Sequence, residues 1–223
     1  MRLTALNGSP RGKSGNTEIL LRWFLEGFES VEGNSHETAY LRRVDEHDAF
    51  VRTFREADAV FLAFPLYTDS MPGIVKAFIE RLAPLVGREG GPPMIFMVQS
   101  GFPEAERSRA VVGYLRNLAK RLGSPCVGAI VRGNCEGIHV MPPFMTRKVR
   151  RAMREMGAGY ARTGGLDPEA VARFAGPERL SPFARVVFTL LGMLGLTDFY
   201  WNMNLRKHGA YARRFARPDE GKW

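Results

Sequence analysis

The sequence predicts an α/β protein with a doubly wound, five-stranded parallel sheet and a helical extension at its C-terminal end. Three observations support this prediction. Short apolar runs alternate with helical patterns over residues 1–163. A loop of small and hydroxylated residues, 8–17, joins the first apolar run to the first helical pattern. The alternation stops at Thr163, Gly164 and Gly165, which indicates a break before a different kind of segment.

The elements before the break follow one another in a regular order. The N-terminal run, residues 2–7, is typical of a buried strand. Apolar residues after the loop recur at helical spacing, namely Ile19, Leu20, Trp23, Phe24 and Phe28. The same reasoning places strands near 2–7, 37–41, 58–64, 93–100 and 126–131, and helices near 17–29, 46–56, 72–86, 104–122 and 144–161.

The segment after the break is predicted to be a helical, basic extension, so the chain divides into residues 1–163 and 164–223. In order, it contains a short helix, an apolar stretch and a basic end, near 167–175, 183–201 and 206–217. The apolar centre, 186–196, lies between two charged residues and is too short to cross a bilayer. We expect this centre to pack on the core or on a second copy, with contact to a membrane surface as the alternative.

Composition restricts the class of protein further. A chain of 223 residues suits one domain with a substantial core and an appendage. The sequence has two cysteines and leads directly from its first residue into a strand, so a cytoplasmic location is expected. Neither a catalytic triad nor a zinc-ligand spacing is present, so no metal is assigned.

The formal net charge of +9 is concentrated in two clusters. These are Arg147, Lys148, Arg150, Arg151 and Arg154 on one predicted helix, and Arg206, Lys207, Arg213, Arg214 and Arg217 near the C-terminal end. Because no nucleic-acid recognition motif accompanies them, we expect no nucleic-acid partner. Attraction for an anionic dinucleotide or an acidic membrane accounts for the charge equally well.

The loop 8–17 is suited to hold a phosphate group. It lies between a strand and a helix, where backbone N–H groups and the helix dipole favour an anion. Ser9, Ser14 and Thr17 add hydroxyl donors, and Arg11 adds a guanidinium. A simple polar helix cap is the alternative. A cap accounts for Asn16 or Thr17 but not for the whole loop.

Two common nucleotide-binding patterns do not fit this loop. A P-loop needs four residues between its glycines, whereas only three separate Gly8 from Gly12. The next strand also ends in Phe64, Pro65, Leu66 and Tyr67 rather than in a magnesium-binding Asp. The dinucleotide fingerprint G-x-G-x-x-G is absent from the loop. Both classes are therefore disfavoured.

Three segments together resemble the flavin-binding loops of the flavodoxin-like, NAD(P)H-dependent FMN reductases. They are Leu6–Thr17, Phe64–Gly73 with the helix that follows it, and Gln99–Glu104. The resemblance covers about residues 1–160 and places the segments in the family's order. It implies a three-layer flavodoxin-like fold with strand order 2-1-3-4-5. In this fold, the loops after strands one, three and four meet at the switch point.

The resemblance implies FMN as the cofactor and assigns three groups of residues to it. The phosphate would be held by Ser9, Arg11, Ser14, Gly15, Asn16 and Thr17. The edge of the isoalloxazine ring would be lined by Pro65, Leu66, Tyr67, Thr68, Asp69 and Ser70. Its other edge would be closed by Ser100, Gly101 and Phe102. Because the flavin carries the chemistry, no catalytic side chain is assigned, and Glu104 is expected to be structural. The segment 133–139 follows the fifth strand and could reach the same pocket or that of a partner subunit. Its His139 is expected to be structural, with protonation of a reduced acceptor as the alternative.

The implied activity is oxidoreduction with NADPH or NADH as co-substrate. Hydride would pass through flavin N5 to a quinone or another electron-poor small molecule, such as an azo or nitro compound, and a homodimer is expected. A reductase that supplies reduced flavin to another protein is one alternative. Another is a flavodoxin-like electron carrier or FMN-binding module that does not use nicotinamide, although typical flavodoxins are acidic. Related iron–sulfur flavoproteins are disfavoured because Cys126 and Cys135 are the only cysteines.

Overall fold

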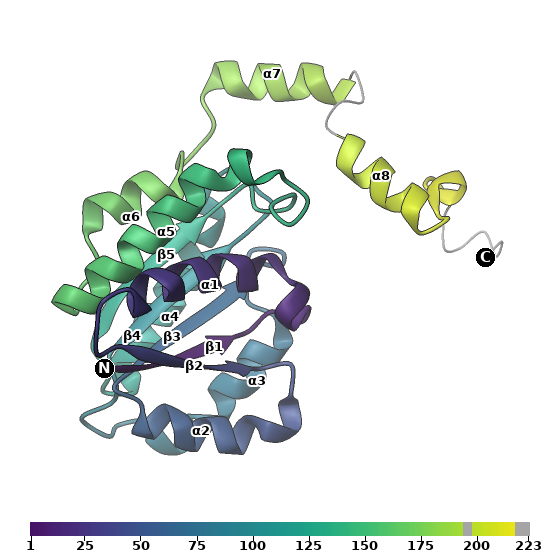
Figure 1. The fold of residues 1–223 in the computed structure, drawn as a ribbon. Helices are drawn as coiled ribbons and strands as arrows, with labels where there is room; N and C mark the ends of the chain where they lie inside the picture. The colour runs from purple at the N-terminus through teal and green to yellow at the C-terminus, as the bar shows by residue number, and fades with distance from the viewer. Residues whose placement is uncertain (194–197, 217–223) are drawn as a thin grey trace. The chain divides into compact units, whose positions relative to one another are not determined.

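The computed structural model describes residues 1–193 and 198–216. The chain divides into two compact units, Met1–Arg179 and Leu180–Trp223. The first unit has three layers, with helices on both faces of one sheet (Figure 1).

The sheet of the first unit has five parallel strands in the order β2-β1-β3-β4-β5. The strands are β1 (Arg2–Asn7), β2 (Ser35–Tyr40), β3 (Ala59–Pro65), β4 (Met94–Gln99) and β5 (Cys126–Arg132). Every residue of β3 and β4 is buried, as expected for central strands covered on both faces. The predicted fold class and strand order are confirmed, and the carboxyl ends of all strands meet at one edge.

The helices cover the two faces in the manner of a doubly wound fold. They are α1 (Asn16–Glu29), α2 (His47–Glu56), α3 (Gly73–Arg81), α4 (Arg109–Arg121), α5 (Pro143–Thr163) and α6 (Pro168–Ala175). One core cluster joins the sheet to α1 and α5, and the other joins it to α2, α3 and α4 (Figure 1). Right-handed crossovers between parallel strands produce this two-sided arrangement.

Helices α1 and α5 are in close backbone contact. A Cβ atom on Gly157 of α5 would lie 2.0 Å from the Phe24 carbonyl oxygen of α1. A Cβ atom on Gly27 would lie equally close, 2.0 Å, to the Arg154 carbonyl oxygen. The ring of Tyr160 stacks on Phe28 beside this crossing. The two glycines therefore fix the separation of the helices.

Several predicted boundaries shift in the structure. The strand expected at 37–41 is β2, which begins and ends earlier. The helix expected at 72–86 ends at Arg81 and is followed by a separate 3-10 turn, Ala83–Leu85, that contains a proline. The helix expected at 104–122 begins at Arg109, because the preceding turn is held by tertiary bonds. In that turn, the N–H groups of Ala105 and Glu106 donate to carbonyls of the chain after α6.

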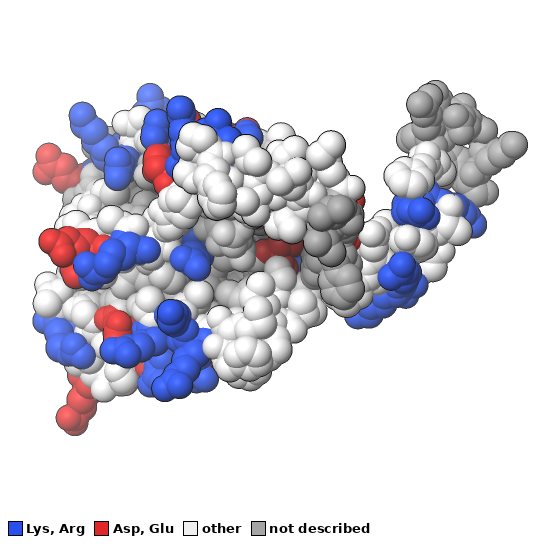
Figure 2. Space-filling view, turned by 90° about the horizontal axis from the view of Figure 1, so that it is seen from above, with Lys and Arg blue, Asp and Glu red and all other residues white. Residues whose placement is uncertain are grey.

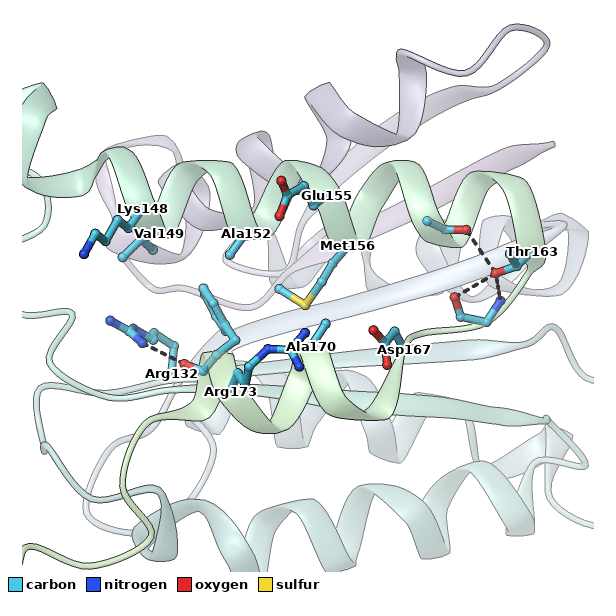
Figure 3. Close-up of a pocket in the computed structure, with 13 residues that line it drawn as sticks. Arg132, Lys148, Val149, Ala152, Glu155, Met156, Thr163, Asp167, Ala170 and Arg173 are labelled. Atoms are coloured by element: carbon cyan, nitrogen blue, oxygen red, sulfur yellow. Dashed lines mark hydrogen bonds between the residues drawn. The ribbon is translucent and has the colours of Figure 1, made fainter.

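Helix α6 belongs to the first unit, so the boundary expected at 163/164 lies instead at 179/180. Phe174 of α6 is buried in the core cluster beneath α5. Arg132 of β5 donates to the Phe174 carbonyl oxygen at 2.7 Å and stacks on its ring (Figure 3). An open cavity of about 610 Å³ remains between α5 and α6. The contacts that place α6 in the first unit are with residues far away in the sequence. The break at Gly164 is a local pattern and does not indicate these contacts.

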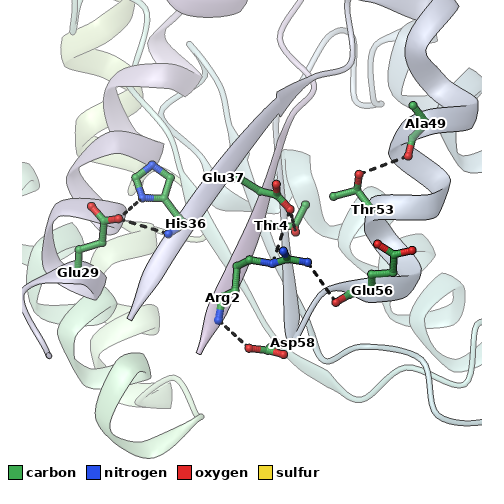
Figure 4. Close-up of polar contacts among 9 residues, drawn as sticks. All are labelled: Arg2, Thr4, Glu29, His36, Glu37, Ala49, Thr53, Glu56 and Asp58. Carbon is green, nitrogen blue, oxygen red and sulfur yellow. Dashed lines mark hydrogen bonds and ion pairs between the residues drawn. The ribbon is translucent and has the colours of Figure 1, made fainter. Parts of the chain in front are cut away.

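Polar contacts fix the amino ends of β1 and β2, opposite the edge where the strand ends meet. The Arg2 backbone N–H donates to Asp58 Oδ2 at 2.7 Å, and Thr4 Oγ1 donates to Glu37 Oε1 at 3.0 Å (Figure 4). His36 Nδ1 lies 2.7 Å from Glu29 Oε1. The first bond ties β1 to the chain before β3, and the other two hold the half-exposed edge strand β2 against β1 and α1.

The second unit contains α7 (Pro182–Met193) and α8 (Phe199–Lys207), which replace the apolar stretch expected at 183–201. Residues 194–197 of the expected apolar centre, and Arg217 of the basic end, lie outside the described residues. Among the helices of the described chain, none is long and apolar enough to cross a membrane.

Candidate functional site

The phosphate loop follows β1 as a tight, internally bonded turn. The Ser9 N–H donates to Asn7 Oδ1 at 2.9 Å, and Ser9 Oγ accepts from the Arg11 N–H at 3.3 Å. Ser14 Oγ donates to the Arg11 carbonyl at 2.9 Å, so its hydroxyl proton is used within the loop. The side chains of Arg11 and Ser14 are exposed, whereas Ser9 is buried. The Ser9 hydroxyl keeps its proton available for a ligand.

Gly15 allows the loop to approach the start of α1 closely. A Cβ atom at this position would lie 2.6 Å from Ser9 Oγ. Gly15 is the residue before α1 and supplies no side-chain cap. The N–H groups of Asn16 and Thr17, in the first turn of α1, therefore remain available to an anion.

The side chains of Asn16 and Thr17 contact other strand ends. Asn16 Nδ2 donates to the carbonyls of Cys135 at 2.7 Å and Glu136 at 3.1 Å, and its Oδ1 lies 3.1 Å from His139 Nδ1. The Asn16 amide is thus engaged by the chain after β5. Thr17 Oγ1 accepts from Gln99 Nε2 at 3.2 Å, which leaves the hydroxyl proton of Thr17 to donate elsewhere.

A polar network behind the loop fixes its position. Glu18 accepts from Asn7 Nδ2 at 2.8 Å and from the Tyr40 hydroxyl at 3.1 Å. Desolvation and the nearby Glu18 carboxylate raise the pKa of Tyr40 to about 12, so this phenol remains a donor at neutral pH. Lys13 lies over the Tyr40 ring, 5.6 Å from its centroid, and adds positive charge beside the loop.

The second predicted loop is a tight turn that presents one aromatic ring. The Tyr67 N–H donates to the Ser70 carbonyl at 2.8 Å, and the Ser70 N–H returns a bond to Tyr67 at 3.1 Å. Thr68 and Asp69 between them have positive φ angles of 47° and 62°, which is unusual for residues with side chains. Tyr67 is 48% exposed, whereas Leu66 belongs to the core.

The buried part of this loop includes Pro65, whose side chain is buried like that of Leu66. The Leu66 N–H donates to the Gln99 carbonyl at 2.7 Å, which ties the loop to the end of β4. A ligand at the strand ends would therefore meet the backbone of this segment and the Tyr67 ring.

The third predicted loop, after β4, is tied to the chain after β5. Ser100 is buried, and its N–H donates to the Arg132 carbonyl at 2.9 Å. The Phe102 carbonyl accepts from Ser100 Oγ at 3.3 Å and from the Asn134 N–H at 3.0 Å. A Cβ atom on Gly101 would lie 3.3 Å from Glu136 Oε2. The Phe102 ring is 42% exposed.

Arg107 connects the second and third loops. Its Nη1 lies 3.6 Å from Asp69 Oδ2, and its guanidinium lies over the Phe102 ring, 5.4 Å from the centroid. The residue belongs to the turn before α4 that the sequence analysis assigned to a helix. The sequence pattern around Arg107 predicted only a helix and did not indicate this contact. The contact depends on where the tertiary fold places the turn.

The three predicted loops therefore meet at the carboxyl edge of the sheet. Direct bonds join the first to β4 through Thr17, the second to β4 through Leu66, and the third to β5 through Ser100. The segment 133–139, expected as able to reach this pocket, lies against Asn16, and Gln99 at the start of the third loop contacts Thr17.

Comparison with known proteins shows the family to which the chain belongs. A family model described as NADPH-dependent FMN reductase matches residues 1–128, more than half of the chain. The matched residues include all three loops. The chain belongs to this family. FMN is its cofactor, and it is an NAD(P)H-dependent reductase.

Individual relatives agree with this assignment. The chain is 30% identical over 156 residues to an iron–sulfur flavoprotein from Archaeoglobus fulgidus, covering 59% of this chain and 68% of that protein. An iron–sulfur cluster usually takes four thiolates, whereas this FMN reductase has two cysteines.

Solved structures show the same fold. One is an FMN-dependent NADH-azoreductase from Bacillus anthracis in complex with FMN, with a TM-score of 0.56 and 13% identity over 72% of this chain and 100% of that chain. Another is the NAD(P)H:quinone oxidoreductase of Methanothermobacter marburgensis, with a TM-score of 0.52 and 16% identity. The match covers 70% of this chain and 96% of that chain.

The donor set of the FMN reductase fits the phosphate of its cofactor. The available donors are the buried Ser9 hydroxyl, the Thr17 hydroxyl and two first-turn N–H groups, and Gly15 lets the loop that carries Ser9 pack closely on the start of α1. These groups donate hydrogen bonds, and exposed Arg11 supplies charge, as a phosphate dianion requires. The residues present therefore fit a phosphate ester.

We expect the two cysteines of the FMN reductase to differ in reactivity. Burial raises the pKa of the Cys135 thiol to about 12, so little thiolate forms at neutral pH, whereas Cys126 is exposed. A chromogenic disulfide reagent should titrate one thiol rapidly in the native protein and both after unfolding. Cys126→Ser should abolish the rapid phase. Rapid native labelling of Cys126→Ser would contradict the buried position of Cys135.

Proposed function

We propose that this FMN reductase passes hydride from NAD(P)H, through flavin N5, to a quinone or another flat, electron-poor small molecule. Bound FMN supplies the two-electron chemistry, as it takes hydride from a nicotinamide and gives it to an acceptor. The chain's own residues bind the flavin, shape the space beside it and exclude water.

The phosphate would be bound by Ser9, Arg11 and Thr17, and by the N–H groups of Asn16 and Thr17. The first two contribute a buried hydroxyl and an exposed guanidinium, and the helix start contributes its dipole. Ser14 and the Asn16 side chain would act indirectly, since their donor groups already hold the loop and the chain after β5. Gly15 provides the room for close approach.

The observation that carries the acceptor proposal is the pair of exposed aromatic rings on the second and third loops. Tyr67 and Phe102 are about half exposed, and Arg107 contacts the loops that carry both. A flat acceptor beside the flavin can pack against exposed aromatic rings, and the guanidinium favours oxygen atoms that gain negative charge. The names of two similar solved structures, an azoreductase and a quinone oxidoreductase, are consistent with flat, electron-poor acceptors.

The proposal is tested by two anaerobic mixing steps with the FMN-loaded protein. NADPH or NADH should bleach the flavin absorbance, and a water-soluble benzoquinone or an azo dye should then restore it. A flavin that neither nucleotide reduces would assign the chain to electron carriers. Rapid reduction without reoxidation by either acceptor would instead favour the release of reduced flavin to another protein.

Arg107→Gln should impair the acceptor step alone. Loss of the guanidinium removes the contacts with Asp69 and Phe102, so we expect the KM for the acceptor to rise by about 3- to 10-fold. The rate of flavin reduction by NADPH should stay unchanged. Steady-state kinetics and stopped-flow absorbance measure the two quantities.

Arg116→Gln is the matched control, because Arg116 is an exposed residue of α4 outside the site. An equal effect of both variants on the acceptor KM would contradict the role of Arg107.

The homodimer and the cytoplasmic location stay predictions from the sequence. Measuring the mass of the protein in solution tests the homodimer.

A further inference from the structure

Helix α7 is almost entirely apolar, yet none of its residues is buried. Phe183 is 78% exposed and Met193 is 81% exposed, and the side chains of Val186, Phe188 and Leu190 are exposed as well. A contiguous apolar surface of this kind marks a site of interaction.

The residues of α7 are sorted by face. Phe183, Val186 and Leu190 follow i, i+3, i+7 spacing and lie along one side. Arg185 and Thr189 lie one turn apart on another side, and the Thr189 hydroxyl donates to the Arg185 carbonyl at 2.9 Å. The helix can therefore bury a broad apolar side at an interface while Arg185 remains in water.

A basic and aromatic cluster lies at the end of α8 and in the turn that follows it. The guanidinium groups of Arg206 and Arg214 lie 4.4 and 4.2 Å from the centroid of the Tyr211 ring. Arg214 also lies 4.6 Å from the Phe215 ring, which is 83% exposed. Figure 2 shows blue Lys and Arg side chains among white ones on this segment. The cluster holds positive charge beside exposed aromatic surface.

The other basic cluster, on α5, is partly paired with carboxylates. Arg150 lies 2.9 Å from Glu26, and Arg151 lies 2.7 Å from Glu155, so acidic neighbours offset their charge. The C-terminal unit differs in this respect. Among the described residues, no carboxylate forms an ion pair with Arg206, Lys207, Arg213 or Arg214. In the described part of the chain, no ion pair offsets the charge of these four side chains, which suits them to an external anionic surface.

We propose that the C-terminal unit binds the surface of an anionic lipid bilayer, with α7 lying in the plane of the interface. Apolar burial by a short helix and attraction by nearby Arg and Lys side chains are the two contributions that such binding requires. A second copy is a poorer occupant, because it carries the same net charge of +9 and offers the basic cluster no excess of negative charge. The inference does not depend on the flavin chemistry.

The test is co-sedimentation of the full FMN-loaded chain with vesicles of phosphatidylcholine alone or mixed with phosphatidylserine. We expect binding to the mixed vesicles that weakens as salt is added, and little binding to phosphatidylcholine alone. Arg206→Gln with Arg214→Gln should lower the partition coefficient by about 30-fold at low salt. Phe183→Ser with Leu190→Ser should lower it by at least about tenfold.

Matched controls lie in the first unit. Arg116→Gln and Phe144→Ser change exposed residues of the same types and should leave vesicle binding unchanged. Retained flavin absorbance and far-UV circular dichroism report that each variant is folded. Absence of binding to the mixed vesicles, or binding that both C-terminal double variants retain, would overturn the proposal. A dimer that the α7 variant dissociates, without vesicle binding, would assign this face to a second copy.

Discussion

Thr17→Val is expected to weaken FMN binding by about 10- to 100-fold, the effect of losing one hydrogen bond to a charged group. Valine keeps the shape of the buried threonine but removes its hydroxyl. Because Oγ1 already accepts from Gln99 Nε2, the hydroxyl proton is left to donate to the flavin phosphate. Riboflavin lacks that phosphate, so its affinity should change by less than about twofold. Fluorescence titration of the flavin-free protein measures both affinities.

Thr53→Val in α2 is the matched control. Its hydroxyl donates to the Ala49 carbonyl at 3.3 Å within the helix, and the residue is not part of any of the three loops (Figure 4). This variant should bind FMN as the unmodified protein does. If Thr17→Val weakens FMN and riboflavin binding equally, Thr17 supports the fold of the site and does not contact the phosphate.

Gly157→Ala should lower the free energy of unfolding by about 2 to 3 kcal/mol, the cost of overpacking a tight core. The added methyl would lie 2.0 Å from the Phe24 carbonyl oxygen, a backbone atom that can move only with α1. Since α1 begins at the phosphate loop, the displacement should also weaken FMN binding. Urea unfolding followed by circular dichroism measures the stability change.

Gly159→Ala is a control of opposite sign in the same helix. A Cβ atom at Gly159 meets nothing within 4 Å, so helix propensity alone should stabilise the protein by about 0.5 to 1 kcal/mol. Equal stability changes in the two variants would contradict the close packing of α1 against α5.

The fold of the first unit is readable from the sequence because each local pattern agrees with the final topology. The alternation of apolar runs and helical patterns gives the five strands, and the three loop motifs give the strand ends that meet. Local sequence patterns did not predict the element boundaries that depend on contacts with distant residues. The turn before α4 is held by the chain after α6, and α6 is held by β5 and α5, so neither the start of α4 nor the unit boundary could be predicted.

The candidate site was predictable in outline and less so in its details. Small and hydroxylated residues between a strand and a helix indicate a phosphate loop, but they do not show which donors are already engaged. Asn16 bonds to the chain after β5, and Arg107 contacts Asp69 on another loop. Both contacts join residues far apart in the sequence. Their partners become visible only when the strand ends are brought together.

The central claim is that the loop between β1 and α1 binds the phosphate of FMN. The most direct test is equilibrium titration of the flavin-free protein with FMN and with riboflavin under the same conditions. Several charge-assisted bonds to the phosphate predict that FMN binds at least about 100-fold more tightly than riboflavin. Equal affinities for the two flavins, or no binding of FMN, would contradict the claim.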